Sequence, residues 1–342
     1  MPVKDSILLI YTGGTIGMIH DPLSGTLRPF NFEHIVDQVP ELRRFDFKID
    51  TISFKPLIDS SEVSPRVWIK LAGIIEKNYS SYDGFVILHG TDTMAFSASA
   101  LSFMLDKLAK PVIFTGSQLP IGTLRTDGKE NLITALEIAA AKDGNKAMVP
   151  EVCIYFENNL FRGNRTTKQS TEHFNAFASP NCEPLATTGI TIKYNQNIIL
   201  YPTVRQDLSV KKKMDSNVAI LKLFPGINKK LVQAILDSGA RAVVLESYGA
   251  GNAPTKAWFL NLLKNYIKKG GIIVNVTQCN EGSVQSELYE TGKKLTELGV
   301  ISGRDISLES AITRLMYLLG NYGETDKIKK MLNKALKGEI TV

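Results

Sequence analysis

Short apolar runs alternate with helix-period segments through the first half of this chain. The apolar runs have the length of buried strands and lie at 7–11, 85–88, 112–115 and 152–156. The segments between them repeat their apolar residues at helical spacing and lie at 67–79, 95–108 and 127–141. Alternation of this kind favours a parallel sheet covered by helices on both faces, with right-handed crossover connections.

The alternation weakens after about residue 190 and then resumes. The 193–216 segment is polar and contains only a weak candidate strand at 198–201. Beyond it we expect strands at 218–223, 242–246 and 272–276, and helices at 229–237, 255–268, 308–319 and 326–336. We therefore predict an α/β protein of two α/β domains, each with a mostly parallel sheet flanked by helices. The larger, N-terminal catalytic domain would span 1–192, a linker 193–216, and the smaller C-terminal domain 217–342.

Composition and cysteine content indicate the compartment. Hydrophobic residues make up 44% of the chain and charged residues 22%, which is typical of a folded soluble protein and excludes disorder. The longest apolar stretches fall far short of the roughly 18 residues that a membrane span needs, and the N-terminus lacks the long apolar core of a secretory signal. Three cysteines without a CxxC pair argue against a disulfide framework. We predict a cytoplasmic protein with no membrane contact.

Charge and histidine spacing favour neither a nucleic acid nor a metal as ligand. Much of the net charge of +6 is expected to come from Lys211–Lys213 and from the five lysines at 327–337. No aromatic residues are interleaved with these lysines, so solvated surfaces are favoured over a nucleic-acid footprint. The four histidines have no i, i+4 pair and share no spacing with the cysteines, so no zinc or other metal site is expected.

Polar, glycine-rich loops follow the expected strands. In an open parallel sheet, ligands bind at the carboxyl ends of the strands. The loops at those positions are TGGTIG (12–17), HGTDTM (89–94), TGSQLP (115–120), ESYGAGNAP (246–254) and TQCNEG (277–282). These loops are therefore the candidate functional segments.

Each loop also allows a structural interpretation. TGGTIG lacks the GxGxxG spacing of a phosphate loop. Its glycine pair allows close backbone approach and leaves Thr15 projecting over the strand end, although a tight turn with a capping threonine is an equal alternative. HGTDTM places the hydroxyl of Thr91 next to the carboxylate of Asp92, although either residue could instead cap the following helix.

Two further features carry reactive side chains. RGNRTTK (162–168) concentrates three cations, and its lysine, Lys168, would suit general-base work; a solvated basic turn is the alternative. Cys279 follows a buried strand, where a small core hydrophobe is a more common role for cysteine than a nucleophile. No GxSxG motif is present, which argues against a serine hydrolase of the α/β type.

Together these motifs resemble those of one enzyme family. The resemblance is to bacterial-type L-asparaginases, and to the cytoplasmic (type I) branch in particular. It rests on TGGTIG, DSSE (59–62), HGTDTM, TGSQ (115–118) and RGNRTTK, and it continues through SYGAGNAP, TQC, ETG and GVISGRD in the second half. It implies hydrolysis of L-asparagine to L-aspartate and ammonia by a homotetramer built from intimate dimers, without a metal or organic cofactor.

The resemblance also implies roles for individual residues. Thr15 would be the nucleophile, and Thr91, Asp92 and Lys168 would form the catalytic group beside it. The residues expected to bind the substrate are Asp59, Ser60, Ser61, Gly90, Thr91, Asp92 and, from a neighbouring subunit, Asn252. A carboxamide is a poor electrophile, so a covalent acyl intermediate helps by dividing one difficult step into two.

Two positions depart from the family pattern. Family members often carry a tyrosine on the loop after the first motif, where this chain has Thr26 or Leu27; either the nucleophile is activated differently or Tyr289 substitutes. The type I branch can have an arginine where this chain has Glu246, as part of a second, allosteric asparagine pocket. The remaining residues of that pocket would be Thr167, Thr277, Gln278 and Cys279, and Glu246 is expected to pair with a nearby basic residue such as Arg165.

Two other functions compete with this interpretation. The asparaginase-like subunit of an archaeal-type tRNA-dependent amidotransferase shares the threonine motifs but normally carries an extra N-terminal domain, whereas TGGTIG begins at residue 12 here. A catalytically silent protein that senses asparagine is the other competitor. The intact Thr15, Thr91, Asp92 and Lys168 argue against it.

Overall fold

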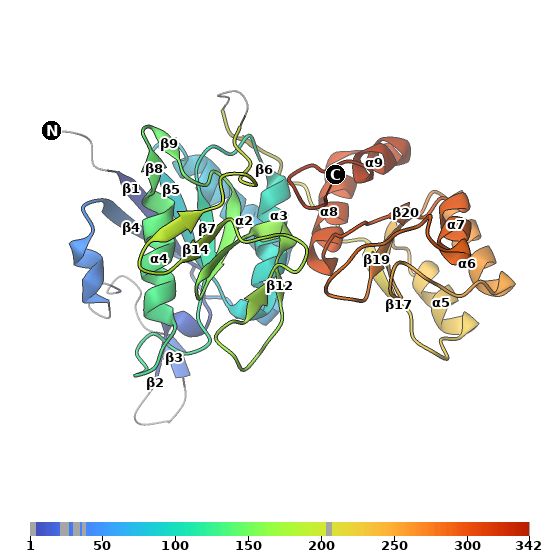
Figure 1. Cartoon of the computed structure of the whole chain (residues 1–342), viewed down its shortest axis with the longest axis horizontal. Coiled ribbons are helices and arrows are strands. Elements are labelled where there is room, and N and C mark those ends of the chain that lie inside the picture. The colour runs from blue at the N-terminus through green and yellow to red at the C-terminus, as the bar shows by residue number, and fades with distance from the viewer. Residues whose placement is uncertain (1–4, 21–26, 30–34, 36–38, 203–206, 342) are drawn as a thin grey trace. The chain divides into compact units, whose positions relative to one another are not determined.

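The computed structural model describes residues 5–20, 27–29, 35, 39–202 and 207–341 (Figure 1). The chain forms two compact units, Met1–Lys212 and Lys213–Val342. The division falls inside the 193–216 segment that the sequence suggested as a linker. Each unit contains its own sheet and its own buried core.

The N-terminal unit is organised around an eight-stranded sheet in the order β15-β14-β11-β10-β7-β5-β1-β4. The parallel strands are β4 (Lys48–Ser53), β1 (Ser6–Tyr11), β5 (Gly84–Leu88), β7 (Val112–Thr115) and β10 (Val152–Phe156). The antiparallel strands are β11 (Asn159–Arg162), β14 (Ala186–Thr188) and β15 (Ile192–Tyr194). The carboxyl ends of the five parallel strands therefore meet at one edge of the sheet.

Three helices of this unit follow its parallel strands. They are α2 (Pro65–Asn78), α3 (Met94–Met104) and α4 (Gly128–Ala140). Ser64 is the N-cap residue of α2 and Pro65 lies in its first turn. Proline suits that position because its missing N–H would have no intrahelical partner there.

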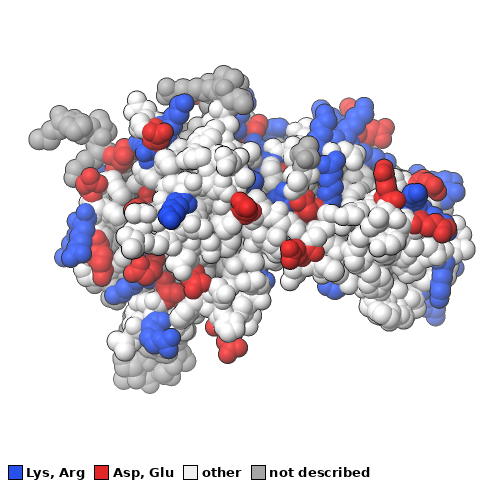
Figure 2. Space-filling view, in the orientation of Figure 1, with Lys and Arg blue, Asp and Glu red and all other residues white. Residues whose placement is uncertain are grey.

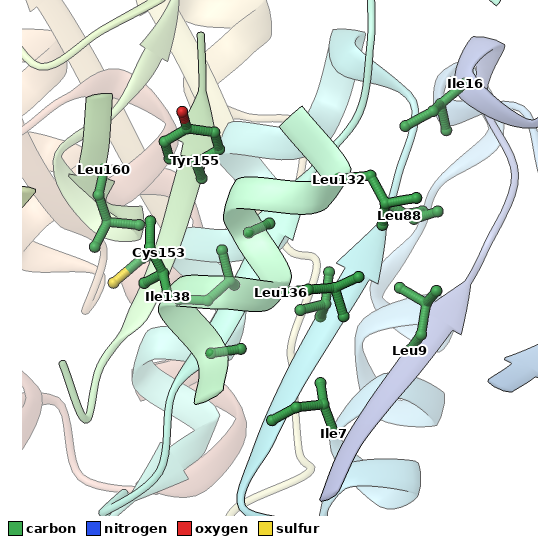
Figure 3. Close-up of a cluster of buried hydrophobic side chains, with 14 of the residues drawn as sticks. Ile7, Leu9, Ile16, Leu88, Leu132, Leu136, Ile138, Cys153, Tyr155 and Leu160 are labelled. Atoms are coloured by element: carbon green, nitrogen blue, oxygen red, sulfur yellow. The ribbon is translucent and has the colours of Figure 1, made fainter. Parts of the chain in front are cut away.

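The core of the N-terminal unit follows from strand alternation. Leu9 of β1 and Leu88 of β5 belong to the buried cluster that includes α4, and Figure 3 shows Leu132 of α4 pointing toward Leu88. Leu8 and Ile10 are equally buried, and successive strand residues point to opposite faces. Both faces of the sheet are therefore covered, as the alternation predicted.

A buried hydrogen-bonded chain joins α2, α3 and the end of β5. The indole Nε1–H of Trp68 donates to Ser97 Oγ at 2.9 Å, and Ser97 Oγ lies 2.9 Å from His89 Nε2. His89 Nδ1 lies 2.7 Å from the carbonyl oxygen of Gly90. An indole N–H only donates, so we assign the Ser97 hydroxyl proton to His89 Nε2. Nδ1–H of the neutral imidazole then donates to Gly90.

The C-terminal unit has a parallel four-stranded sheet in the order β17-β18-β19-β20. Its strands are β17 (Val218–Lys222), β18 (Ala242–Ser247), β19 (Ile272–Thr277) and β20 (Ile301–Ser302). Its helices are α5 (Lys229–Leu236), α6 (Ala257–Lys268), α7 (Glu290–Glu297), α8 (Leu308–Asn321) and α9 (Thr325–Leu332). A buried cluster that includes Leu245, Phe259 and Ile273 holds the sheet against α6. The predicted class, two α/β units with mostly parallel sheets, is confirmed.

The predicted strand at 198–201 is wrong. The backbone there bonds to a buried ion pair and not to a neighbouring strand. The Arg162 guanidinium donates to the carbonyl of Ile198 at 2.5 Å. The N–H of Leu200 donates to Glu151 Oε1 at 2.7 Å. Charged side chains thus satisfy the backbone groups that a strand would use. The edge strand is β15, a few residues earlier.

Two predicted helices end earlier than expected. The helix expected at 95–108 ends at Met104, because Leu105–Asp106 forms β6 and pairs with β16 (Ser209–Val210). The helix expected at 326–336 ends at Leu332, and the Arg314 guanidinium donates to the carbonyl of Lys334 just beyond it. Long-range partners decide both ends, so local periodicity could not place them.

The excess positive charge lies in the C-terminal unit. Residues 1–212 contain 22 basic and 22 acidic side chains, whereas residues 213–342 contain 18 basic and 12 acidic ones. On the face shown in Figure 2, acidic side chains lie among the lysines and arginines. This interspersion fits the solvated surfaces that the sequence favoured.

We predict that His89 makes stability depend on pH below neutrality. Burial lowers the pKa of His89 to about 4, against the opposing effect of its hydrogen bond to Gly90, whereas an unfolded histidine titrates near pH 6.5. Between these values the unfolded chain binds a proton that the folded chain does not. The free energy of unfolding should therefore fall as pH drops through 6.5 toward 4, by up to about 3 kcal/mol.

Urea denaturation at several pH values in this range measures the effect. In His89→Gln, the slope of the unfolding free energy against pH should correspond to about one fewer proton taken up on unfolding. The control is His173→Gln, at an exposed histidine, which should leave this slope unchanged. Equal pH dependence in wild type and His89→Gln would show that His89 is not the group responsible.

Candidate active site

The loops that follow β4, β1 and β5 pack backbone to backbone at the carboxyl edge of the sheet. Gly13 and Gly14 have φ angles of 136° and 93°, a region that glycine enters easily. A Cβ on Gly14 would lie 2.6 Å from the Cα of Gly90, and a Cβ on Gly90 would lie 2.6 Å from Ser60 Oγ. The glycines thus permit three loops to meet, and Thr15, the residue after Gly14, begins a 3₁₀ turn beside them.

Thr91, Asp92 and Lys168 form a connected group. Lys168 Nζ donates to Thr91 Oγ1 at 2.8 Å and to Asp92 Oδ1 at 2.7 Å. The lysine side chain is 15% exposed, whereas that of Asp92 is 64% exposed. The structure therefore brings together three of the four predicted catalytic residues and leaves a carboxylate open to a ligand.

Neither Thr91 nor Asp92 uses its side chain to cap a helix. Gly90 is the N-cap of the 3₁₀ turn Thr91–Thr93, and Thr93 is the N-cap of α3 without a side-chain capping bond. Thr93 Oγ1 donates instead to the carbonyl of Ser60 at 2.6 Å. The capping alternative for HGTDTM is therefore wrong.

The RGNRTTK segment is buried and is not a solvated turn. Arg162, Asn164, Arg165 and Thr166 are each less than 9% exposed. Arg162 Nε donates to Glu151 Oε2 at 2.7 Å inside the unit. A buried ion pair tolerates little displacement, because separating its charges leaves each one unpaired. This pair anchors the segment that carries Lys168 at its end.

The DSSE segment supplies ordered hydroxyls beside Asp92. Asp59 Oδ1 accepts from the backbone N–H and the hydroxyl of Ser61, both at 2.8 Å. These bonds hold the pKa of Asp59 below its ordinary value, so this group is an acceptor at neutral pH. Ser60 Oγ donates to Asp92 Oδ2 at 3.5 Å. The structure thus places the DSSE residues next to the group formed by Thr91, Asp92 and Lys168.

Asp127 and Asn131, which sequence reasoning missed, fix a fourth loop at this edge. Asp127 accepts from the backbone N–H groups of Gln118 and Leu119, with distances of 2.9–3.2 Å. Asn131 Nδ2 donates to the carbonyl of Gly116 at 3.0 Å, and a Cβ on Gly116 would lie 2.4 Å from the carbonyl oxygen of His89. The only sequence signal was a pair of polar residues one turn apart at the start of α4.

Asn252 lies in a tight turn of the C-terminal unit, after β18. Backbone hydrogen bonds of 2.9 and 2.8 Å join Tyr248 and Asn252. Thr291 in α7 donates to Asn252 Oδ1 at 2.5 Å. Tyr289, the suggested substitute for the loop tyrosine, is 50% exposed and precedes the same helix. Of the two loop positions, Thr26 lies outside the described residues and Leu27 begins β3 (Leu27–Pro29).

The residues of the suggested second pocket are divided between the units. Thr167 belongs to β12 (Thr167–Lys168) in the N-terminal unit. In the C-terminal unit, Gln278 Nε2 donates to the carbonyl of Glu246 at 2.8 Å, and Thr277 Oγ1 accepts from the N–H of Cys279 at 3.0 Å.

Glu246 pairs with a nearby basic residue, as expected, and that residue is Lys222, at 3.4 Å, because residues 222 and 246 are direct neighbours in the register of β17 and β18. One expectation for this region was wrong. Cys279 is a free, exposed thiol and not a core residue, because the chain leaves the sheet at Thr277.

Among the described residues, no group of three or more His, Cys, Asp or Glu side chains could hold a metal ion. In the same part of the chain, no helix is long and apolar enough to cross a membrane.

Comparisons with known proteins identify relatives across nearly the whole chain. Residues 6–200 match the family model of the N-terminal asparaginase domain, and residues 217–332 match that of the glutaminase/asparaginase C-terminal domain. L-asparaginase 1 of Escherichia coli K12 is 43% identical over 344 residues, which cover 99% of this chain and 98% of the relative. The 60 kDa lysophospholipase of Homo sapiens is 40% identical over 98% of this chain, which corresponds to 61% of that protein.

A solved structure agrees in fold as well as in sequence. The crystal structure of L-asparaginase I from Vibrio cholerae has a TM-score of 0.90 and 38% identity, and the match covers 99% of this chain and 100% of the other. Both halves of the chain thus match family models. The chain belongs to the asparaginase family of amidohydrolases.

Proposed function

We propose that this protein is an L-asparaginase that hydrolyses L-asparagine to L-aspartate and ammonia through an acyl-enzyme on Thr15. The observation that carries the proposal is the contact of Lys168 Nζ with both Thr91 Oγ1 and Asp92 Oδ1. This group follows Gly90, against which the Thr15 loop packs through Gly14. Two threonine hydroxyls, a lysine and a carboxylate thus belong to loops in contact.

Thr15 begins the reaction in this mechanism. Its oxygen attacks the carboxamide carbon, and its proton is passed on through Thr91, whose oxygen touches Lys168. The carbon–nitrogen bond then breaks, and the amide nitrogen leaves as ammonia with that proton. Water hydrolyses the ester, which releases aspartate and restores the hydroxyl. Positioned proton transfer of this kind contributes roughly 10²–10⁴-fold to the rate.

The α-ammonium and α-carboxylate groups of asparagine each have partners at this edge of the sheet. The exposed carboxylate of Asp92 pairs with the α-ammonium group. The Ser60 and Ser61 hydroxyls turn from Asp92 and Asp59 to donate to the α-carboxylate. Asp59 contributes by ordering Ser61 through its backbone N–H, because an ionised carboxylate cannot donate to another one. Backbone N–H groups at Gly90 and Thr91 stabilise the oxyanion, and a preorganised donor of this kind is worth roughly 3–4 kcal/mol.

The assembly and location follow the same resemblance. We propose a homotetramer in which Asn252 of one subunit completes the substrate site of a neighbour. A cytoplasmic location fits the three cysteines, which are all unpaired. The mechanism needs no metal or organic cofactor.

Ammonia release by the purified protein separates this function from its competitors. An L-asparaginase produces ammonia and aspartate from free asparagine without tRNA. A tRNA-dependent amidotransferase subunit needs charged tRNA and its partner, and an asparagine sensor binds without turnover. Lysophosphatidylcholine should be offered as a further substrate, because one relative is named as a lysophospholipase. Absence of ammonia release from free asparagine would contradict the proposal.

We predict that Thr15→Ala folds normally and lowers kcat for asparagine by about 10³-fold or more, because the acyl bond can no longer form. Thr91→Val should lower kcat comparably, since residues that act as one unit have non-additive effects. Thr187→Ala, at an exposed position in β14, is the matched control. Rapid quenching and peptide mass spectrometry should locate the aspartyl group on Thr15. Retention of a tenth of the activity in Thr15→Ala, or acylation of Thr91, would reassign the nucleophile.

We also predict hyperbolic initial-rate curves for asparagine. A second asparagine site would need a cation for the α-carboxylate. Glu246 is an anion 3.4 Å from Lys222 and would repel that group. An unoccupied pocket contributes no coupling between sites. Steady-state kinetics of the homogeneous oligomer test this, and a Hill coefficient well above one would show that an activating site is present despite Glu246.

A further inference from the structure

We propose that Thr291 is a positioning residue that fixes the orientation of the Asn252 amide, so that Asn252 offers N–H donors and recognises the carboxylate of the substrate. This inference rests on the proposed function, in which Asn252 reaches the substrate. It adds Thr291 to the site and specifies which end of the Asn252 amide faces the substrate. Thr291 belongs to α7 and is 39 positions from Asn252 in the chain.

The backbone of the turn is held by groups other than Thr291. Thr277 Oγ1 donates to the carbonyl of Gly249 at 2.7 Å, and Asn275 Nδ2 donates to that of Gly251 at 3.1 Å. The N–H of Gln285 donates to the carbonyl of Ala250 at 3.0 Å. Three successive carbonyl groups are thus bound from three different positions. The Thr291 hydroxyl, by contrast, bonds to the side chain of Asn252. The backbone conformation of the turn is therefore held by the other three groups and not by Thr291.

The contact with Thr291 determines which end of the amide is available. A side-chain amide has an oxygen that accepts and an NH₂ group that donates, and rotation by 180° exchanges them. Thr291 Oγ1 lies 2.5 Å from Asn252 Oδ1, and two oxygens come this close only with a proton between them. The hydroxyl supplies that proton because the amide oxygen has none. Nδ2–H is therefore left for the substrate.

This orientation selects the substrate group that Asn252 can bind. N–H donors pair with carboxylate or carbonyl oxygens, whereas an α-ammonium group needs an acceptor. Asp92 already provides an exposed carboxylate for the ammonium. We therefore infer that Asn252 binds the α-carboxylate together with the DSSE hydroxyls, and that the short bond from the Thr291 hydroxyl to Oδ1 holds the amide in this orientation.

Steady-state kinetics of two Thr291 variants test the positioning role. Thr291→Val keeps the shape but removes the hydroxyl, so KM for asparagine should rise about fivefold while kcat changes less than about twofold. Thr291→Ser keeps the hydroxyl and should restore KM to near the wild-type value. Thr296→Val is the matched control, because Thr296 lies on the same helix and its hydroxyl donates to the carbonyl of Gly292 within that helix. A rise in KM with Thr296→Val equal to that with Thr291→Val would overturn the proposal.

A double-mutant cycle separates positioning from general stability. If Thr291 acts through Asn252, then Thr291→Val should have no further effect on KM in an Asn252→Ala background. Urea denaturation of each variant reports stability independently. Additive effects on KM would show that Thr291 acts by another route, and the proposal would fail.

Asn252→Asp tests the polarity directly. An aspartate can still accept from Thr291, but its second oxygen cannot donate and would face the substrate carboxylate. We expect KM to rise by at least about tenfold. An unchanged or lower KM would mean that Asn252 accepts from the ammonium group, and the proposal would be wrong.

Calorimetric binding of L-aspartate, the product, extends the test beyond turnover. Kd for aspartate should follow the same order as KM across the Thr291 and Asn252 variants. If the wild type binds aspartate with this pattern but does not hydrolyse asparagine, the proposed function fails while the role of Thr291 stands. If turnover is normal and the pattern is absent, only the role of Thr291 fails. If aspartate does not bind the wild type and asparagine is not hydrolysed, both fail.

Discussion

Close backbone contact at the carboxyl edge of the first sheet is the constraint on which the candidate site depends. Gly14 touches Gly90, and Gly90 touches Ser60, with no room for a Cβ at either glycine. Because the strands are neighbours and parallel, their loops meet there without any long excursion of the chain. The hydroxyls and the carboxylate of three motifs are consequently held within reach of one small ligand. Side chains of any size at the glycine positions would separate the loops.

The contacts around the site are polar and largely buried, which makes the loops rigid. The neutral imidazole of His89 fixes the carbonyl of Gly90, and Arg162 with Glu151 anchors the segment that ends in Lys168. Buried polar groups are costly when unpaired and stabilising when fully paired. A small displacement of either anchor would leave a buried group without its partner. The same hydrogen bonds that stabilise the folded loops thus also hold the side chains of the candidate site in place.

The sequence predicted β1, β5 and β18 because they are buried on both faces, and such strands appear as continuous apolar runs. It missed the parallel strand β4, whose residues are at most partly buried. Polar, glycine-rich residues after a strand indicated the TGGTIG and HGTDTM loops, whereas DSSE was found only through the family resemblance. Prediction failed where the partner lies far along the chain. The carbonyl of Ile198 is bound by Arg162, 36 positions away, and not by a neighbouring strand. The local pattern at 198–201 contains no information on that partner.

Loops at a sheet edge have no neighbouring strand to satisfy their carbonyl groups, so side chains must do it. Thr93 bonds to the carbonyl of Ser60, Asn131 to that of Gly116 and Thr277 to that of Gly249. The threonines and asparagines of such loops therefore form two groups: those that hold the backbone and those that face a ligand. Both groups have the same residue types at similar spacing, so sequence cannot separate them. Thr91 and Thr93 show the difference most directly, since they are two residues apart and only the first contacts the lysine.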